Sequence, residues 1–303
     1  MRPNPEVNIA ADHYRFDGVL RRIALLLLLG AGSGGASAVN QPSVSLIIDD
    51  MGNRRVTDLA AIRLPGPVAY AFLPHSPHAA ELATLAFEKN KEVLLHVPMQ
   101  ATSKRKLGPG GITATMNRVD LMQTVSAGLK SVPYVSGINN HMGSMVTSRH
   151  KHMGWLMDLM RVRGNLYFVD SRTTRHTIAL DTARSNGIPS TWRDVFLDNE
   201  LIESNIKVEF ARLIEIARKR GTALAIGHPH ETTVSYLAEM IPRLKALGIR
   251  LVPVARLIQL RGEEMPPFDR TTSRAIHAHD LVAAPGPETL TQSSASGQAA
   301  ITK

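Results

Sequence analysis

The sequence contains no cysteine among its 303 residues. Thiol catalysis, disulfide bonds and cysteine-ligated zinc are therefore excluded, and any bound metal must be held by histidine and carboxylate side chains. Aromatic residues are also scarce, at 5% of the chain, and they do not interleave with the basic clusters. Because the net charge of +9 comes from scattered lysines and arginines rather than one basic stripe, we expect no nucleic acid partner.

A glycine-rich phosphate loop is missing as well. The cluster formed by Gly108, Gly110 and Gly111 falls in a long loop rather than at a turn from strand to helix, so it is not a nucleotide motif. Apolar strands alternate instead with amphipathic segments, roughly seven or eight strands over about 215 residues, which is typical of an α/β barrel. An open doubly wound sheet remains the alternative.

Two local signals along this alternation are clear enough to set boundaries. Residues 206–220 have the apolar spacing of an amphipathic helix that ends at Gly221. A second helix is expected over residues 120–129, with Asp120 as its amino-terminal cap.

The two ends of the chain differ in composition from the rest. Arg21 and Arg22 precede a short apolar run and the small residues of an Ala36-Ser37-Ala38 cleavage site, which predicts a signal peptide over residues 1–38. We expect export to the periplasm or cell envelope and no membrane span in the mature chain; an uncleaved anchor is the alternative. Residues 263–303 are rich in Pro, Ser, Thr and Ala without periodicity, which predicts a disordered tail after a folded domain at 39–262.

The apolar run at residues 43–48 ends in two adjacent acids, Asp49 and Asp50, followed by Gly52. Strands of a parallel sheet are apolar on both faces, and ligands gather beyond their carboxyl ends. Acids in this place are therefore candidates for a site, although a carboxylate that caps the next helix is the structural alternative. Later apolar runs also end in polar groups, namely His96, His141, Asp170, and the pair His228 and His230. Several such ends indicate one opening lined by metal ligands and acid/base groups.

Taken together in chain order, these segments resemble the divergent polysaccharide deacetylase family, a branch of the carbohydrate esterase family 4 type of deacetylase. The resemblance covers about residues 43–260 and rests on six motifs, which are Ile47-Ile48-Asp49-Asp50-Met51-Gly52, Leu95-His96-Val97-Pro98-Met99, Asn139-Asn140-His141-Met142-Gly143-Ser144, Asp170-Ser171-Arg172-Thr173, Arg193-Asp194-Val195-Phe196-Leu197-Asp198 and Gly227-His228-Pro229-His230. It implies a distorted (β/α) barrel of about seven strands with a mononuclear metal site of one Asp and two His. The expected occupant is a divalent ion, for which this donor set favours zinc.

The resemblance also implies roles for single residues. Asp49 would be the general base and Asp50 a metal ligand, although neighbouring side chains on a regular strand point to opposite faces. His96 matches the first histidine of the metal motif. The usual second histidine is missing, because Gln100 stands in its place. His141 is then the candidate third ligand, with a structural histidine as the alternative.

The remaining candidates concern proton transfer. His228 is the candidate general acid, with His230 in reserve, and Asp170 would orient or tune a histidine. Arg172 would pair with Asp170 or contact substrate, and Arg193 and Asp194 would pair with each other or line the opening.

The sequence thus favours a secreted, metal-dependent N- or O-deacetylase of an acetylated envelope polysaccharide. The alternatives are a non-catalytic carbohydrate- or protein-binding module on the same barrel, or another metallohydrolase, because a fold does not determine a function. The sequence contains no signal for protein partners.

Overall fold

The computed structural model describes residues 41–263. They form a nine-stranded sheet with the strand order β6-β5-β4-β3-β2-β1-β8-β7, and β9 pairs with β1 beside this path. The signal peptide predicted at 1–38 and the tail predicted from 263 onward lie outside the described residues, apart from Glu263. The strands are β1 (Ser43–Met51), β2 (Ala69–Phe72), β3 (Val93–Met99), β4 (Val135–Met142), β5 (Tyr167–Asp170), β6 (Ser190–Trp192), β7 (Val195–Phe196), β8 (Thr222–Gly227) and β9 (Arg250–Leu251).

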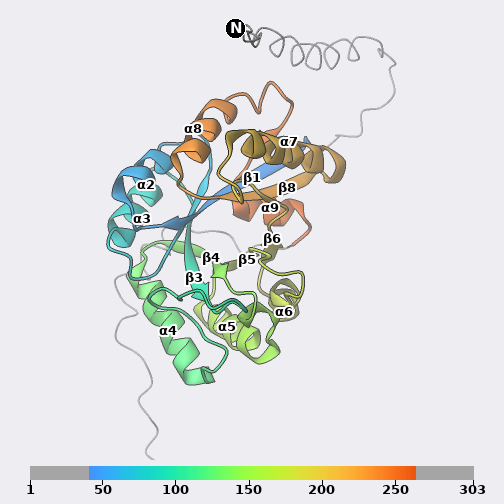
Figure 1. Cartoon of the computed structure of the whole chain (residues 1–303). Helices are drawn as coiled ribbons and strands as arrows, with labels where there is room; N and C mark the ends of the chain where they lie inside the picture. Colours follow the sequence, from blue (N-terminus) through green and yellow to red (C-terminus); the bar gives the residue numbers. More distant parts are fainter. Residues whose placement is uncertain (1–40, 264–303) are drawn as a thin grey trace, which may run out of the picture. The chain divides into compact units, whose positions relative to one another are not determined.

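Helices follow most strands, and all but α9 lie along the outside of the curled sheet (Figure 1). Helix α7 ends at Gly221, as predicted, because this glycine adopts the left-handed conformation with φ of 82°. The predicted cap of α4 is wrong by one turn: Asn117 is the cap, and its side chain accepts the backbone N–H of Asp120. The helices are α2 (Arg55–Ile62), α3 (Ala79–Glu88), α4 (Arg118–Ser131), α5 (His150–Arg163), α6 (Ala179–Ser185), α7 (Glu203–Arg220), α8 (Glu231–Met240) and α9 (Val254–Leu260).

All strand pairs are parallel, and the barrel-like α/β fold expected from the alternation is confirmed. The edge strands β6 and β7 belong to opposite edges of the sheet but are separated by Arg193 and Asp194 alone. The Arg193 N–H donates to the carbonyl of Asp170 beside β6, and the Asp194 N–H donates to the carbonyl of Leu224 on β8. The two-residue link therefore joins the two edges of the sheet. In a closed barrel, hydrogen bonds between the edge strands would join them instead.

The two faces of the strands belong to different apolar clusters. On β1, Leu46 and Ile48 pack in the large cluster with the outer helices, whereas Ile47 packs in a smaller cluster with Leu257 and Ile258 of α9. This alternation follows from the two-residue period of a strand. Within the described part of the chain, no helix is long and apolar enough to span a bilayer.

The turn after β1 has an unusual backbone. Asp50 has φ of 58° and Gly52 has φ of 110°, and the pairing of β1 with β2 shifts register between Ile48 and Met51. The buried carboxylate of Asp58 accepts the N–H of Gly52 at 2.8 Å, which anchors the turn. A Cβ at Gly52 would lie 2.0 Å from Ser76 Oγ, so only glycine fits this position.

We predict opposite effects of the same change at two glycines. Gly52→Ala should lower the free energy of unfolding by more than about 1 kcal/mol, because its positive φ and the contact with Ser76 both disfavour a Cβ. Gly154 lies within α5, and a Cβ added there would meet no other atom within 4 Å, so Gly154→Ala should raise the free energy of unfolding by about 0.4–1 kcal/mol. Urea unfolding of both variants checks this, and equal effects would contradict the described turn.

Candidate metal centre and its cavity

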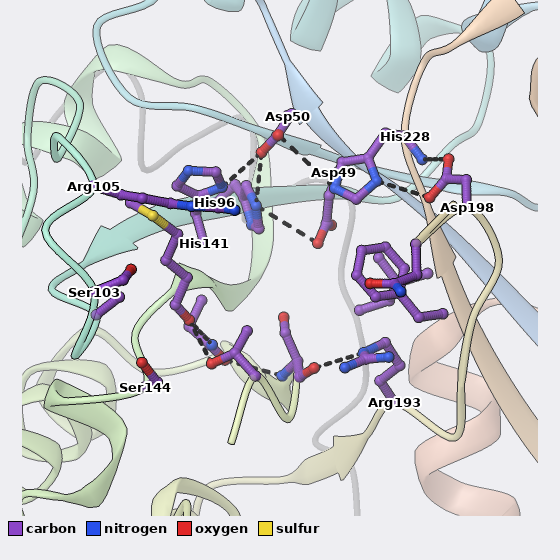
Figure 2. Close-up of a pocket in the computed structure, with 18 of the residues that line it drawn as sticks. Asp49, Asp50, His96, Ser103, Arg105, His141, Ser144, Arg193, Asp198 and His228 are labelled. Carbon is purple, nitrogen blue, oxygen red and sulfur yellow. Dashed lines mark hydrogen bonds and ion pairs between the residues drawn. The ribbon is translucent and has the colours of Figure 1, made fainter. Parts of the chain in front are cut away.

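A cavity of about 600 Å³ lies at the carboxyl ends of the strands. Asp49 and Asp50 enter it from the end of β1, His96 from β3, His141 from β4, and His228 from the segment after β8 (Figure 2). Six of the seven predicted site residues thus line one cavity, and they come from three strands and the segment after a fourth. His230 also lines the cavity, and Asp170 is absent from its lining.

Asp50 lies at the centre of this arrangement. Its Oδ1 is 2.8 Å from His141 Nδ1 and 3.1 Å from His96 Nε2. The same oxygen is buried and makes no hydrogen bond of acceptable geometry. Burial raises the pKa of Asp50, but the neighbouring His141 and His96 outweigh it and hold the pKa far below its ordinary value. The carboxylate is therefore ionised, and its Oδ1 and the two imidazole nitrogens converge on one point.

The hydrogen bonds around His96 determine which of its nitrogens carries a proton. Asn139 donates its amide N–H to Asp49 Oδ1 at 2.8 Å, so its own carbonyl oxygen must face His96 Nδ1, 2.7 Å away. His96 Nδ1 is then the donor, which leaves Nε2 with a lone pair in the neutral ring. That lone pair faces Asp50 Oδ1 and, at 3.6 Å, Asp49 Oδ2. Three acceptors facing one another require a cation between them, either a proton or a metal ion.

The donor set fits a divalent metal. Asp50, His96 and His141 each offer one ligand atom, and these atoms lie within 4.8 Å of one another. One carboxylate oxygen and two imidazole nitrogens, with room in the cavity for a further ligand, is a composition that suits zinc in catalytic sites. The bond from His96 to Asn139 is the kind of outer contact that orients a ligating imidazole. Burial restricts the His96 ring further, since this residue is only 2% exposed.

Asp49 reaches the same site although it precedes Asp50 directly. The left-handed backbone of Asp50 breaks the regular alternation, so both carboxylates face the cavity. Burial raises the pKa of Asp49 above its ordinary value, and the charges of His96 and His228 oppose this only in part. A carboxylate with a raised pKa is a better proton acceptor near neutral pH.

His228 is held by Asp198, a residue for which the sequence predicted no role. Asp198 Oδ1 accepts from His228 Nδ1 at 2.9 Å, and Asp198 Oδ2 accepts from the His228 backbone N–H at 2.6 Å and from Thr233 Oγ1 at 2.9 Å. His228 Nε2 then points toward the site, 3.8 Å from Asp50 Oδ2. Burial lowers the pKa of His228, but Asp198 outweighs it and, with Asp49 and Asp50, raises the pKa to about 9.

The structure does not support the prediction that Asp170 orients or tunes a histidine of the site. Asp170 is fully buried and accepts from the backbone N–H of Arg172 at 2.8 Å and from Thr177 Oγ1 at 2.9 Å, so it organises the turn after β5. Asp198 is the acid beside His228 because β7, which precedes Asp198, is the neighbour of β8. Asp198 follows a short apolar run, as the other site residues do, and that signal was present in the sequence.

The positions of His230 and Gln100 bear on two alternatives left open by the sequence. The ring of His230 lies 5.9 Å from that of His228, beside Asp198 rather than at Asp50. Gln100, in the place of the usual second histidine, turns away from the site and accepts the backbone N–H of Ala114 at 2.8 Å. The candidate third ligand is accordingly His141, on β4, the strand next to that of His96.

Arg193 and Asp194 do not pair with each other. Asp194 forms an ion pair with Arg261 and accepts from Trp192 Nε1 at 3.0 Å, which places it in the barrel seam. Arg193 lines the cavity and donates to the carbonyls of Ser171 and Arg172.

Comparison with known proteins assigns the chain to a family. Residues 46–258 match the family described as divergent polysaccharide deacetylase. The chain is 38% identical over 223 residues to the uncharacterized protein YibQ of Escherichia coli strain K12, covering 74% of this chain and 69% of that protein. It is 32% identical over 227 residues to an uncharacterized protein of Haemophilus influenzae, covering 75% of this chain and 80% of that one.

Among solved structures, the fold is similar to that of the uncharacterized protein ATU2773 from Agrobacterium tumefaciens C58. The TM-score is 0.69 at 20% identity, covering 75% of this chain and 92% of the other, so the likeness concerns the fold alone. The resemblance found in the motifs is confirmed by the family match. The chain belongs to the divergent polysaccharide deacetylase family.

Proposed function

We propose that this protein is a metal-dependent deacetylase that removes N- or O-acetyl groups from a polysaccharide of the cell envelope. Membership of a deacetylase family supports hydrolase chemistry, and the cavity supports the metal dependence. The observation that carries the proposal is the buried oxygen of Asp50, which faces His96 Nε2 and His141 Nδ1 without a hydrogen bond.

Asp50, His96 and His141 would hold the ion. When bound there, a divalent ion such as zinc supplies Lewis acidity, which polarises an acetyl carbonyl and makes water easier to deprotonate. The protein residues around this centre would position the acetyl group and move the protons. Both tasks would fall to Asp49 and His228, which lie close to Asp50 but are not among the proposed metal ligands.

Asp49 is proposed as the general base. Its Oδ1 is fixed by Asn139, and its Oδ2 faces the cavity side of His96. The hydrogen bond at Oδ1 sets the orientation of the carboxylate and leaves Oδ2 to accept a proton from the attacking water. The raised pKa that burial gives this carboxyl group favours that transfer.

His228 is proposed as the general acid that protonates the departing amine or alkoxide. Asp198 holds the Nδ1–H and so directs the Nε2–H into the cavity. Because the charge of Asp198 stabilises the imidazolium and raises its pKa, His228 carries its proton at neutral pH. Asp198 is therefore a positioning residue, which acts through His228 and does not contact the reacting atoms.

Export to the periplasm or envelope is part of the proposal. It is motivated by the order of Arg21-Arg22, apolar run and Ala36-Ser37-Ala38, and it places the mature amino terminus near Val39. Amino-terminal sequencing of the protein from envelope fractions tests it, and a full-length product in the cytoplasm would contradict it.

The metal ligands can be tested with a substitution that suits the backbone. Asp50→Asn removes the charge but tolerates the left-handed φ, because asparagine adopts this conformation more easily than alanine. Its zinc affinity should fall by more than the roughly 10–100-fold that is typical of losing an outer partner, and His141→Ala should behave similarly. His230→Gln, in the same cavity, should keep its zinc. Calorimetric titration of zinc measures this; unchanged binding by His141→Ala would place the third ligand elsewhere.

The catalytic roles predict a loss of turnover without a loss of metal. Asp49→Asn and His228→Gln should each retain zinc, yet release acetate from an acetylated polysaccharide about 10²–10⁴-fold more slowly. Acetate release from a panel of envelope polymers is the measurement, with zinc content as its control. Zinc-loaded wild-type protein that releases no acetate from any polymer would favour the alternative function, a binding module.

The pH dependence follows from the pair Asp198 and His228. A general acid must be protonated, so kcat/KM should fall as the pH rises through the pKa of His228. Asp198→Asn removes the charge that raises this pKa, so the basic limb should move to lower pH. Thr233→Val removes one hydrogen bond to Asp198 but keeps the charge of Asp198, so it should leave the limb nearly in place. A basic limb that does not move in Asp198→Asn would exclude His228 as the acid.

A further inference from the structure

Two cavities meet at β7. The first contains the candidate metal centre, and a second of about 610 Å³ extends along the start of α7. Both cavities are lined by Arg193, Phe196 and Asn199. A chain of sugars that reaches the metal centre from this side would therefore pass over Arg193.

The guanidinium of Arg193 is fixed in place by carbonyl groups and forms no ion pair with the described residues. Its Nε donates to the Ser171 carbonyl at 2.6 Å and its Nη2 to the Arg172 carbonyl at 2.9 Å, and it lies 4.7 Å from the centroid of the Phe196 ring. Within residues 41–263, no carboxylate comes within ion-pair distance of it. A partly buried charge without a counter-ion is costly. Of the five N–H donors of an arginine, three remain for a ligand.

Three acids, Asp49, Asp170 and Glu209, act on Arg193 from beyond ion-pair distance, and each also has another partner. Of the acids that line the first cavity, Asp50 lies beside His96 and His141, and Asp198 pairs with His228. Asp49 accepts a hydrogen bond from Asn139. Other arginines of this region are neutralised. Arg212, which lines the second cavity, pairs with Glu209 at 3.3 Å, and Arg261 pairs with Asp194. Arg193 differs from them because, among the described residues, its nearest acids lie beyond ion-pair distance.

A second arginine lines the first cavity from another side. Arg105 belongs to the loop after β3 and lies across the opening from Arg193 in Figure 2. Its guanidinium is exposed and has no ion-pair partner in the part of the chain that the structure describes. The opening thus presents two arginines that form no ion pair with the described residues, in addition to the divalent ion proposed for its centre.

We propose that Arg193, with Arg105 across the cavity, binds an anionic group of the polysaccharide, on the acetylated sugar or on the sugar next to it. This inference rests on the proposed function of the same site. The planar guanidinium of Arg193 offers parallel N–H groups that match a carboxylate or a phosphate. A neutral acetylated polymer would leave this charge without a partner, so the site selects for acidic polysaccharides.

The test compares three oligosaccharides of equal length on the zinc-loaded full chain. They are an N-acetylglucosamine tetrasaccharide, its counterpart with carboxylate-bearing sugars, and its 6-phosphorylated counterpart. Wild-type protein should bind one anionic form about tenfold or more tightly than the neutral one, as expected for charge-assisted hydrogen bonds. The anion that binds more tightly identifies the source of the charge.

The variants separate the arginines. Arg193→Gln should lose the preference, Arg105→Gln should reduce it, and Arg212→Gln should retain it because that arginine is already paired. Arg193→Lys keeps a positive charge and should retain part of the preference, which guards against loss through misfolding. The wild-type preference should also shrink as salt is added.

The binding assay and the acetate-release assay test the two proposals separately. A charge preference without acetate release would reject the deacetylase proposal and leave the anion site standing. Acetate release with equal binding of all three oligosaccharides would overturn the anion site alone, as would a preference that survives in a folded Arg193→Gln. Failure to bind any of the three would also overturn it.

Discussion

The left-handed backbone of Asp50 is the constraint on which the centre depends. On a regular strand Asp49 and Asp50 would point to opposite sides, and one of them would be buried among helices. With φ of 58° at Asp50, both carboxylates reach one cavity. A residue other than glycine in this conformation is strained, and such strain is retained where the surrounding structure imposes it. Here Gly52, bound by Asp58 and packed against Ser76, holds the turn.

The barrel is joined at a seam of two residues, and this seam also serves the site. Asp194 faces the sheet interior and ties Arg261, Trp192 and β8 together, which secures the junction between the two edges. Arg193, the neighbouring residue, lines the cavity. The same two-residue link therefore completes the fold with one side chain and presents a positive charge to a ligand with the other.

The polar groups of the cavity form two hydrogen-bonded clusters rather than a collection of isolated ions. Asn139 links Asp49 to His96, and Asp198 links Thr233 to His228, so each group that would act has a partner that sets its orientation. Buried polar groups are favourable only when they are satisfied in this way. Asp50 Oδ1 and Ser171 Oγ have no such partner, and an unsatisfied buried carboxylate oxygen between two imidazoles is the strongest structural argument for a cation at that point.

The sequence by itself determined the fold class, the family and most of the cavity. Apolar runs that end in Asp49, Asp50, His96, His141 and His228 were sufficient, because parallel strands place their carboxyl ends at one edge of the sheet. The tertiary structure decided what local pattern cannot encode. Strand order places Asp198, not Asp170, beside His228, and the bulge at Asp50 aims two neighbouring carboxylates the same way. Which side chains share a partner depends on contacts between segments far apart in sequence, such as the ion pair between Asp194 and Arg261, and these contacts exist only once the sheet has closed on itself.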